Sequence, residues 1–208
     1  GTIILIPFYL ENVMGYSPRA VGLLLAVVPV AVGITAPLSG ALSDRVGTRP
    51  IAVAGLAMIV LGFVAVSTLS LDTTAAGYVL RYLPVGIGIG IFQSPNNSAV
   101  MGAVPRERLG IASGLLSITR TLGQTTGISV LGALWASRVA ARAGSALAQG
   151  ATAAPAAAQV AGLNDTFRVV IVLLSLALML AAWGLVQERR MRALAAAQSA
   201  HTSRAENR

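Results

Sequence analysis

Polar side chains interrupt two otherwise apolar stretches of the sequence, and these side chains are best placed to bind a ligand. In residues 109–136, Ser113, Ser117, Arg120, Gln124 and Gly127 follow one another at intervals of four, three, four and three. This spacing places them on one face of an α-helix. An ionisable group inside a membrane helix is a candidate functional group, although the serines and Arg120 could also merely join neighbouring helices.

A second polar cluster surrounds Pro95 and consists of Gln93, Asn96 and Asn97. Their amide groups could form hydrogen bonds with a substrate in a cavity. They could equally satisfy backbone carbonyls that are left without a partner because proline has no N–H group. Together with Ser113, Ser117, Arg120 and Gln124, these three residues are the candidates for lining a substrate path.

The sequence lacks the residues for covalent, acid–base or metal chemistry. It contains no cysteine, its one histidine (His201) lies in a polar tail, and its seven acidic residues lie outside the long apolar stretches. We therefore expect no enzyme activity, cofactor or metal. Gly86, Gly88 and Gly90 do not form a dinucleotide fingerprint, because position 91 is isoleucine and no strand precedes them. They predict close helix packing instead.

Composition places the chain in a membrane. Of its 208 residues, 55% are hydrophobic and 11% are charged, whereas soluble domains carry about 25% charged residues. The apolar residues form long blocks, and about 18 of them in a row can cross a bilayer as a helix. The net charge of +8 would also suit a nucleic-acid partner, but the arginines lie mostly at the ends of apolar blocks, so we expect a lipid bilayer and no nucleic acid.

We therefore expect an all-α integral membrane protein, built as a six-helix transmembrane bundle whose first helix is truncated. The alanine-rich segment 138–162 is expected to be a loop, with residues 164–166 capping the last span. Pro29 and Pro37 are expected to kink the second span, and Ser17 to cap its start ahead of Pro18. The membrane part covers residues 1–187, with spans at about 2–14, 18–43, 50–69, 78–104, 109–136 and 167–186, and residues 188–208 form a cytoplasmic tail.

A short polar turn at residues 40–50, GALSDRVGTRP, separates the second and third spans. Asp44 is expected to accept from backbone N–H groups at the start of the next helix, or to pair with an arginine. The pattern G-x-L-S-D-R-x-G-x-R resembles the signature loop of the major facilitator superfamily of secondary transporters. The residues that carry this resemblance are Gly40, Leu42, Asp44, Arg45, Gly47 and Arg49.

Further strings resemble the fourteen-span drug:proton antiporters of that superfamily. They are GYSPRAVGLL at residues 15–24, GIGIGIFQSP at 86–95 and PRERLGIASGLLSITRTLGQ at 105–124. The resemblance implies the carboxyl-terminal six-helix half of an exporter that takes small lipophilic compounds, cationic ones among them, in exchange for protons. The missing amino-terminal half would be its partner and would hold the proton-coupling residues.

Charge gives an expected orientation. Short arginine-rich loops stay on the cytoplasmic side. We therefore expect the 40–50 turn, the 105–108 turn and the carboxyl-terminal tail on the cytoplasmic side of the cell membrane. Arg81, near the outer end of its span, is expected to reach the headgroups. Two alternatives stay open: an uptake or metabolite transporter of the same fold, and a membrane sensor or assembly protein that transports nothing.

Overall fold

The computed structural model describes residues 2–143 and 150–206, and over these ranges it contains helices and turns but no strand. A π-helical turn, Tyr9–Val13, continues the first helix, and 3-10 turns lie at Arg106–Arg108 and Ala151–Ala153. The expected all-α membrane fold is confirmed. The α-helices are α1 (Thr2–Phe8), α2 (Pro18–Leu25), α3 (Val27–Val46), α4 (Thr48–Val66), α5 (Ala75–Gly102), α6 (Leu109–Ala143) and α7 (Ala156–Glu206).

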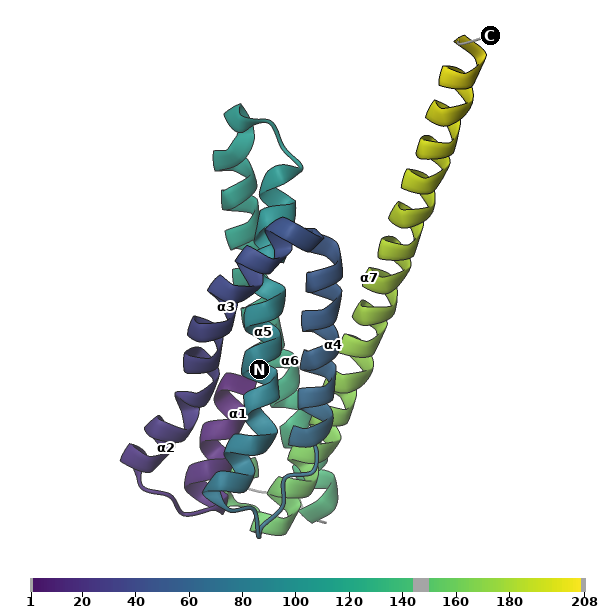
Figure 1. The fold of residues 1–208 in the computed structure, drawn as a ribbon. Helices are drawn as coiled ribbons and strands as arrows, with labels where there is room; N and C mark the ends of the chain where they lie inside the picture. Colours follow the sequence, from purple (N-terminus) through teal and green to yellow (C-terminus); the bar gives the residue numbers. More distant parts are fainter. Residues whose placement is uncertain (1, 144–149, 207–208) are drawn as a thin grey trace.

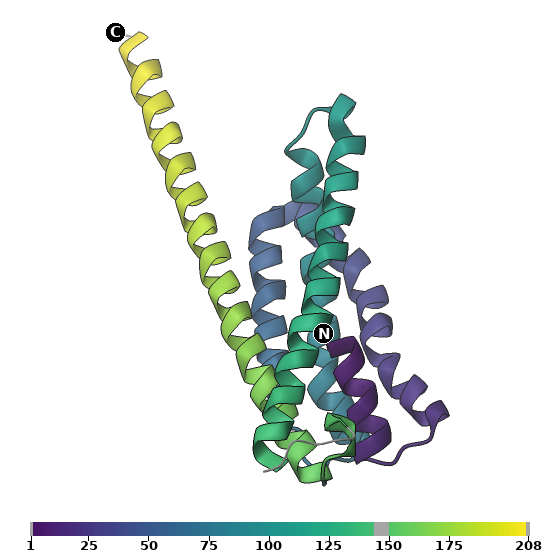
Figure 2. The ribbon, with the colours of Figure 1, turned by 180° about the vertical axis from the view of Figure 1, so that it is seen from behind.

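Helix α5 occupies the centre of the bundle, with α3 and α4 packed along it (Figure 1). Helix α6 packs against the first part of α7 and against the short α1, as the view from behind shows (Figure 2). Helix α7 then leans away from the other helices toward its carboxyl-terminal end. The turns before α4 and α6 lie toward that same end of the bundle, and the turns before α5 and α7 lie toward the other.

Four stretches of helix are long and apolar enough to cross a membrane: Pro18–Val46, Thr48–Val66, Ala75–Gly102 and Ala156–Glu188. Large apolar side chains on their outer faces are exposed, among them Ile34 at 61%, Leu38 at 66% and Leu180 at 68%. Such surface would be a liability in water, whereas lipid covers it at no cost. Helix α6 has 35 residues and carries the polar face described above.

Glycines on α4 and α5 allow these two helices to touch through their backbones. A Cβ atom at Gly88 would lie 2.6 Å from the Ile59 nitrogen, and one at Gly62 would lie 2.7 Å from the Val85 nitrogen. A Cβ at Gly86 would similarly lie 3.1 Å from the Val28 Cα on α3. The expectation that these glycines serve close helix packing is therefore confirmed.

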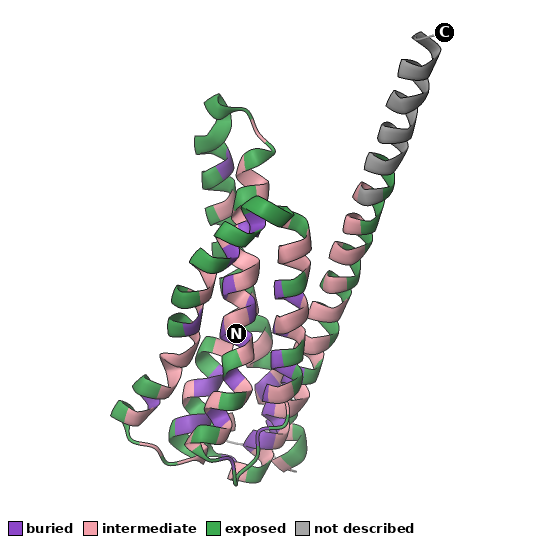
Figure 3. Cartoon of the chain, in the orientation of Figure 1, coloured by how far each residue is buried: buried purple, intermediate pink, exposed green. Residues whose placement is uncertain are grey.

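Buried side chains gather at the end of the bundle where α1, α4, α5, α6 and α7 meet (Figure 3). Leu10, Val66 and Phe167 are each 0% exposed there. Two hydrogen bonds close the 67–74 turn onto this core: the Tyr9 hydroxyl donates to the Ser70 carbonyl at 2.7 Å, and the Asn164 amide donates to the Leu69 carbonyl at 3.0 Å.

The second span is divided into two helices rather than kinked twice. The Ser17 side chain accepts from the Ala20 N–H, and Pro18 opens α2, as expected. The helix is then interrupted at Ala26, because Pro29 has no N–H to bond the carbonyl four residues back. Pro37, in contrast, lies inside the uninterrupted α3.

The expected turn at residues 40–50 is almost entirely helical, which corrects the sequence interpretation. Helix α3 continues to Val46 and α4 begins at Thr48, so Gly47 alone forms the connection. Its φ of 99° and ψ of 151° lie in a region open essentially to glycine only. The polar residues of this stretch therefore project from the ends of two helices.

The alanine-rich loop is much shorter than expected. Residues 138–143 complete α6 and residues 156–162 already belong to α7, while residues 144–149 lie outside the described part of the chain. The physical reason is helix contact: Gly162 packs against Val139, and the Trp135 indole N–H donates to the Gln159 carbonyl at 3.2 Å. Residues 164–166 are thus helical and do not cap a helix start. At the far end, α7 continues through the expected tail to Glu206.

The glycine contacts generate a stability prediction. Gly88→Ala should lower the free energy of unfolding by about 1–3 kcal/mol, because overpacking forces helix backbones apart. Thermal unfolding of the detergent-solubilised protein would measure the loss. Gly22→Ala is the matched control, since Gly22 also lies inside a helix and a Cβ there meets no atom within 4 Å. Equal melting temperatures for the two variants would contradict the packing account.

Candidate functional site

A polar cavity of about 380 Å³ lies between α5 and α6. Helix α5 contributes one wall and the first half of α6 contributes the other, so side chains far apart in sequence face the same space. Five of the seven residues expected on a substrate path are brought together here. The lining consists of Ile89, Phe92, Gln93, Asn96, Asn97, Leu116, Thr119, Arg120 and Gln124.

Arg120 is the charged residue in this lining. Its Nη2 donates to the Asn97 Oδ1 over a long 3.5 Å, so one of its five N–H donors has a weak, neutral acceptor. No carboxylate stands among the described lining residues. The cavity therefore offers a permanent positive charge beside four amide side chains and three apolar ones.

The amides around Pro95 are not needed to repair the helix. Pro95 leaves the Ile91 carbonyl without its usual donor, and the Ser39 hydroxyl of α3 donates to that carbonyl at 2.7 Å. The interpretation that Gln93, Asn96 and Asn97 satisfy freed backbone carbonyls therefore loses its main reason. Ser39 could not be predicted as the partner of this carbonyl, because it lies on another helix.

Ser113 and Ser117 do not line the cavity, although they share the helical repeat of Arg120. Both serines are exposed. Sequence reasoning overlooked Thr119, which lines the cavity while its Oγ1 donates to the Leu115 carbonyl at 2.8 Å. A polar residue directly before Arg120 was the available signal.

The first half of α6 leaves its glycines open. A Cβ atom at Gly110, Gly114 or Gly123 would meet no heavy atom within 4 Å. Gly110 and Gly114 are four residues apart, a spacing that favours close helix contact, and over the described residues no helix of this chain makes that contact. The first half of α6 is therefore free to receive something else.

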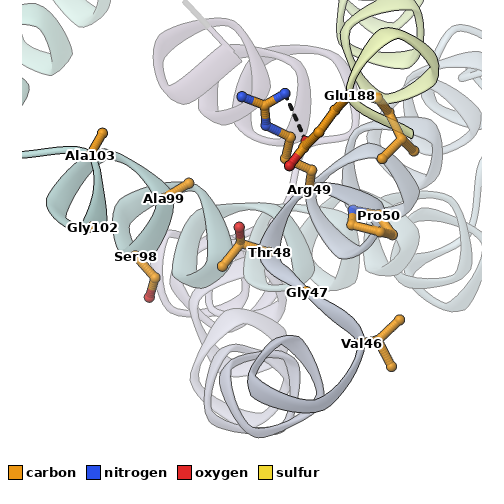
Figure 4. Close-up of a pocket in the computed structure, with 11 residues that line it drawn as sticks. Val46, Gly47, Thr48, Arg49, Pro50, Ser98, Ala99, Gly102, Ala103 and Glu188 are labelled. Carbon is orange, nitrogen blue, oxygen red and sulfur yellow. Dashed lines mark ion pairs between the residues drawn. The ribbon is translucent and has the colours of Figure 1, made fainter. Parts of the chain in front are cut away.

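Two of the six signature residues, Gly47 and Arg49, line a second cavity of about 470 Å³ at the end of the bundle that holds Gly47 (Figure 4). Arg49 reaches across it and pairs with Glu188 of α7, with 2.8 Å between Nη1 and Oε2. Asp44 is exposed and forms no hydrogen bond or ion pair with the residues that the structure describes. Neither expected contact of Asp44 is present: α4 has no side-chain cap, and Arg49 uses a different acid.

Two hydrogen bonds hold the Arg81 side chain beside the 67–74 turn. Its Nε donates to the Thr68 Oγ1 at 3.0 Å, and its Nη1 donates to the Gly77 carbonyl at 3.0 Å. These bonds keep the guanidinium beside the 67–74 turn, away from the polar cavity. This position suits the expectation that Arg81 lies near the headgroups.

Comparison with known proteins gives a single family. The family model described as Major Facilitator Superfamily matches residues 1–128, which include both walls of the polar cavity. The chain is 37% identical over 126 residues to the uncharacterized transporter YebQ of Escherichia coli, covering 61% of this chain and 28% of that protein. It is 37% identical over 137 residues to the multidrug resistance protein Stp of Mycobacterium tuberculosis, covering 65% and 25%.

A third relative is the riboflavin transporter RibZ of Clostridioides difficile, with 30% identity over 132 residues, covering 64% of this chain and 29% of that protein. The chain thus spans roughly a quarter of the length of the curated relatives that it matches.

The exposed position of Asp44 predicts that it contributes little to stability. Asp44→Asn should change the free energy of unfolding by no more than about 0.5 kcal/mol, as for other surface substitutions without a partner. Arg49→Ala is the comparison, because it removes an ion pair worth up to about 1 kcal/mol. A melting temperature that fell further for Asp44→Asn than for Arg49→Ala would reveal a structural contact of Asp44.

Proposed function

Because the chain belongs to the Major Facilitator Superfamily, we propose that it is the carboxyl-terminal half of a secondary transporter that exports drugs or other lipophilic compounds. The observation that carries this proposal is the polar cavity between α5 and α6, which a protein serving only as an anchor or assembly subunit does not need. Transport would proceed by alternating access, in which two halves rock about a site near the membrane midplane. This half supplies one wall of that site.

An exposed face of α6 is available for contact with a second half. Gly110 and Gly114 are open on it, and small residues on an uncovered membrane helix favour close contact with another helix. The much greater length of the relatives leaves ample chain for six or more further spans. We propose that the amino-terminal half of the same transporter covers this face and closes the cavity.

Proton coupling is part of the proposal and is assigned to the amino-terminal half. A coupling group must gain and lose a proton during the cycle, and arginine stays protonated in proteins. No carboxylate lines the polar cavity among the described residues. Acidic residues facing the cavity from the other half would carry the proton.

Uptake or metabolite transport is the second candidate, and the names of two relatives favour it. One is the riboflavin transporter RibZ, and the other is named as a triacylglyceride transporter of Mycolicibacterium smegmatis, 32% identical over 142 residues. The direction of substrate movement in oriented membrane vesicles, under an imposed proton gradient, distinguishes export from uptake.

The arginine distribution predicts the orientation. Glu107 and Asp72 are both exposed. They belong to the turns before α6 and before α5, and these two turns lie at opposite ends of the bundle (Figure 1). In the complete transporter without other cysteines, Glu107→Cys should resist an impermeant thiol reagent in intact cells and react after permeabilisation. Asp72→Cys should react in both conditions. The reverse pattern would overturn the proposed cytoplasmic carboxyl terminus. Asp72 serves better than the neighbouring Thr73, which is buried.

Arg120 gives the direct test of the cavity. A charge held inside the membrane costs at least about 2.5 kcal/mol, so a residue retained there at such cost should act on the substrate. Arg120→Ala should reduce transport by the complete protein at least tenfold while membrane insertion is unchanged. Arg120→Lys should restore only part of it, because lysine lacks the planar fork. Wild-type transport by Arg120→Ala at equal expression would remove this cavity from the mechanism.

A further inference from the structure

The polar cavity has a charge character that selects among substrates. Arg120 brings five N–H donors and a permanent positive charge, while its described acceptor is a single amide oxygen at 3.5 Å. The lining amides add further donors, and no lining residue that the structure describes is acidic. A ligand group that enters this cavity therefore meets donors in excess, and an anion or strong acceptor satisfies them best.

Apolar side chains complete the lining of the same cavity. Ile89 and Phe92 of α5 and Leu116 of α6 lie beside the polar residues. An apolar surface next to a donor-rich one suits a ligand that carries both kinds of group.

We propose that the substrate is an amphipathic acid, whose anionic head binds Arg120 and whose apolar body packs against Ile89, Phe92 and Leu116 in the polar cavity. The inference rests on the proposed transport function and names its substrate class. Bidentate contact with a planar acid group suits the guanidinium fork.

Binding of three fluorescent compounds with one apolar body tests the head. Pyrenebutyrate, pyrenebutyramide and pyrenebutylamine carry an acid, a neutral amide and a cation. The purified complete transporter should bind the acid at least tenfold more tightly than the amine. Arg120→Gln should remove most of this preference. Arg138→Gln should keep it, because Arg138 is an exposed arginine of the same helix that does not line the polar cavity.

Equal binding of acid and amine, tighter binding of the amine, binding of neither, or a preference that survives Arg120→Gln would each overturn the proposed head site. Transport is measured in a separate experiment, so the proposed acid site and the proposed transport function can be rejected independently. Gradient-driven movement of the amine alone would keep the transporter and reject the acid class. Arg120-dependent binding of the acid without movement of any compound would keep the acid site and reject the proposed function.

Discussion

The absence of side chains at a few glycines allows α5 to touch its neighbours through backbone atoms. Gly62 and Gly88 bring α4 and α5 together, and Gly86 brings α5 against α3. Where backbones approach this closely, a hydroxyl on one helix can reach a carbonyl on the next, and the bond from Ser39 to Ile91 is such a contact. The position of the polar cavity depends on this packing, because it fixes which face of α5 remains for Asn96 and Asn97.

The helices that depend on local composition could be predicted from the sequence, and those that depend on distant contacts could not. Long apolar stretches and the cap at Ser17 locate α2 to α5 closely. The start of α7 was missed, because alanine-rich sequence favours helix only weakly until Gly162 and Gln159 meet α6. The turn at residues 40–50 was predicted too long, since polar residues mark the end of a span but not the end of its helix.

The candidate site, too, could be predicted where it depends on local sequence and not where it depends on contacts between distant helices. The spacing of Arg120 and Gln124 and the amides beside Pro95 were visible in the sequence, and the structure places both groups on one cavity. Periodicity alone also selected Ser113, which lies outside that cavity. A helical repeat gives the face of a residue but not its height along a neighbouring helix, and only the height decides which residues of α6 meet those of α5.

The connection at Gly47 has a consequence for the gene. Every codon for glycine has the form GGN, so a single-base change that alters the residue yields Ala, Val, Asp, Glu, Ser, Cys, Arg or Trp. All of these carry a Cβ atom, and none fits readily at a φ of 99° with a ψ of 151°. A neighbouring residue cannot take over the role, because α3 and α4 follow on either side without a spacer. Missense alleles at this codon should therefore be depleted in any functional library, whatever the compound used for selection.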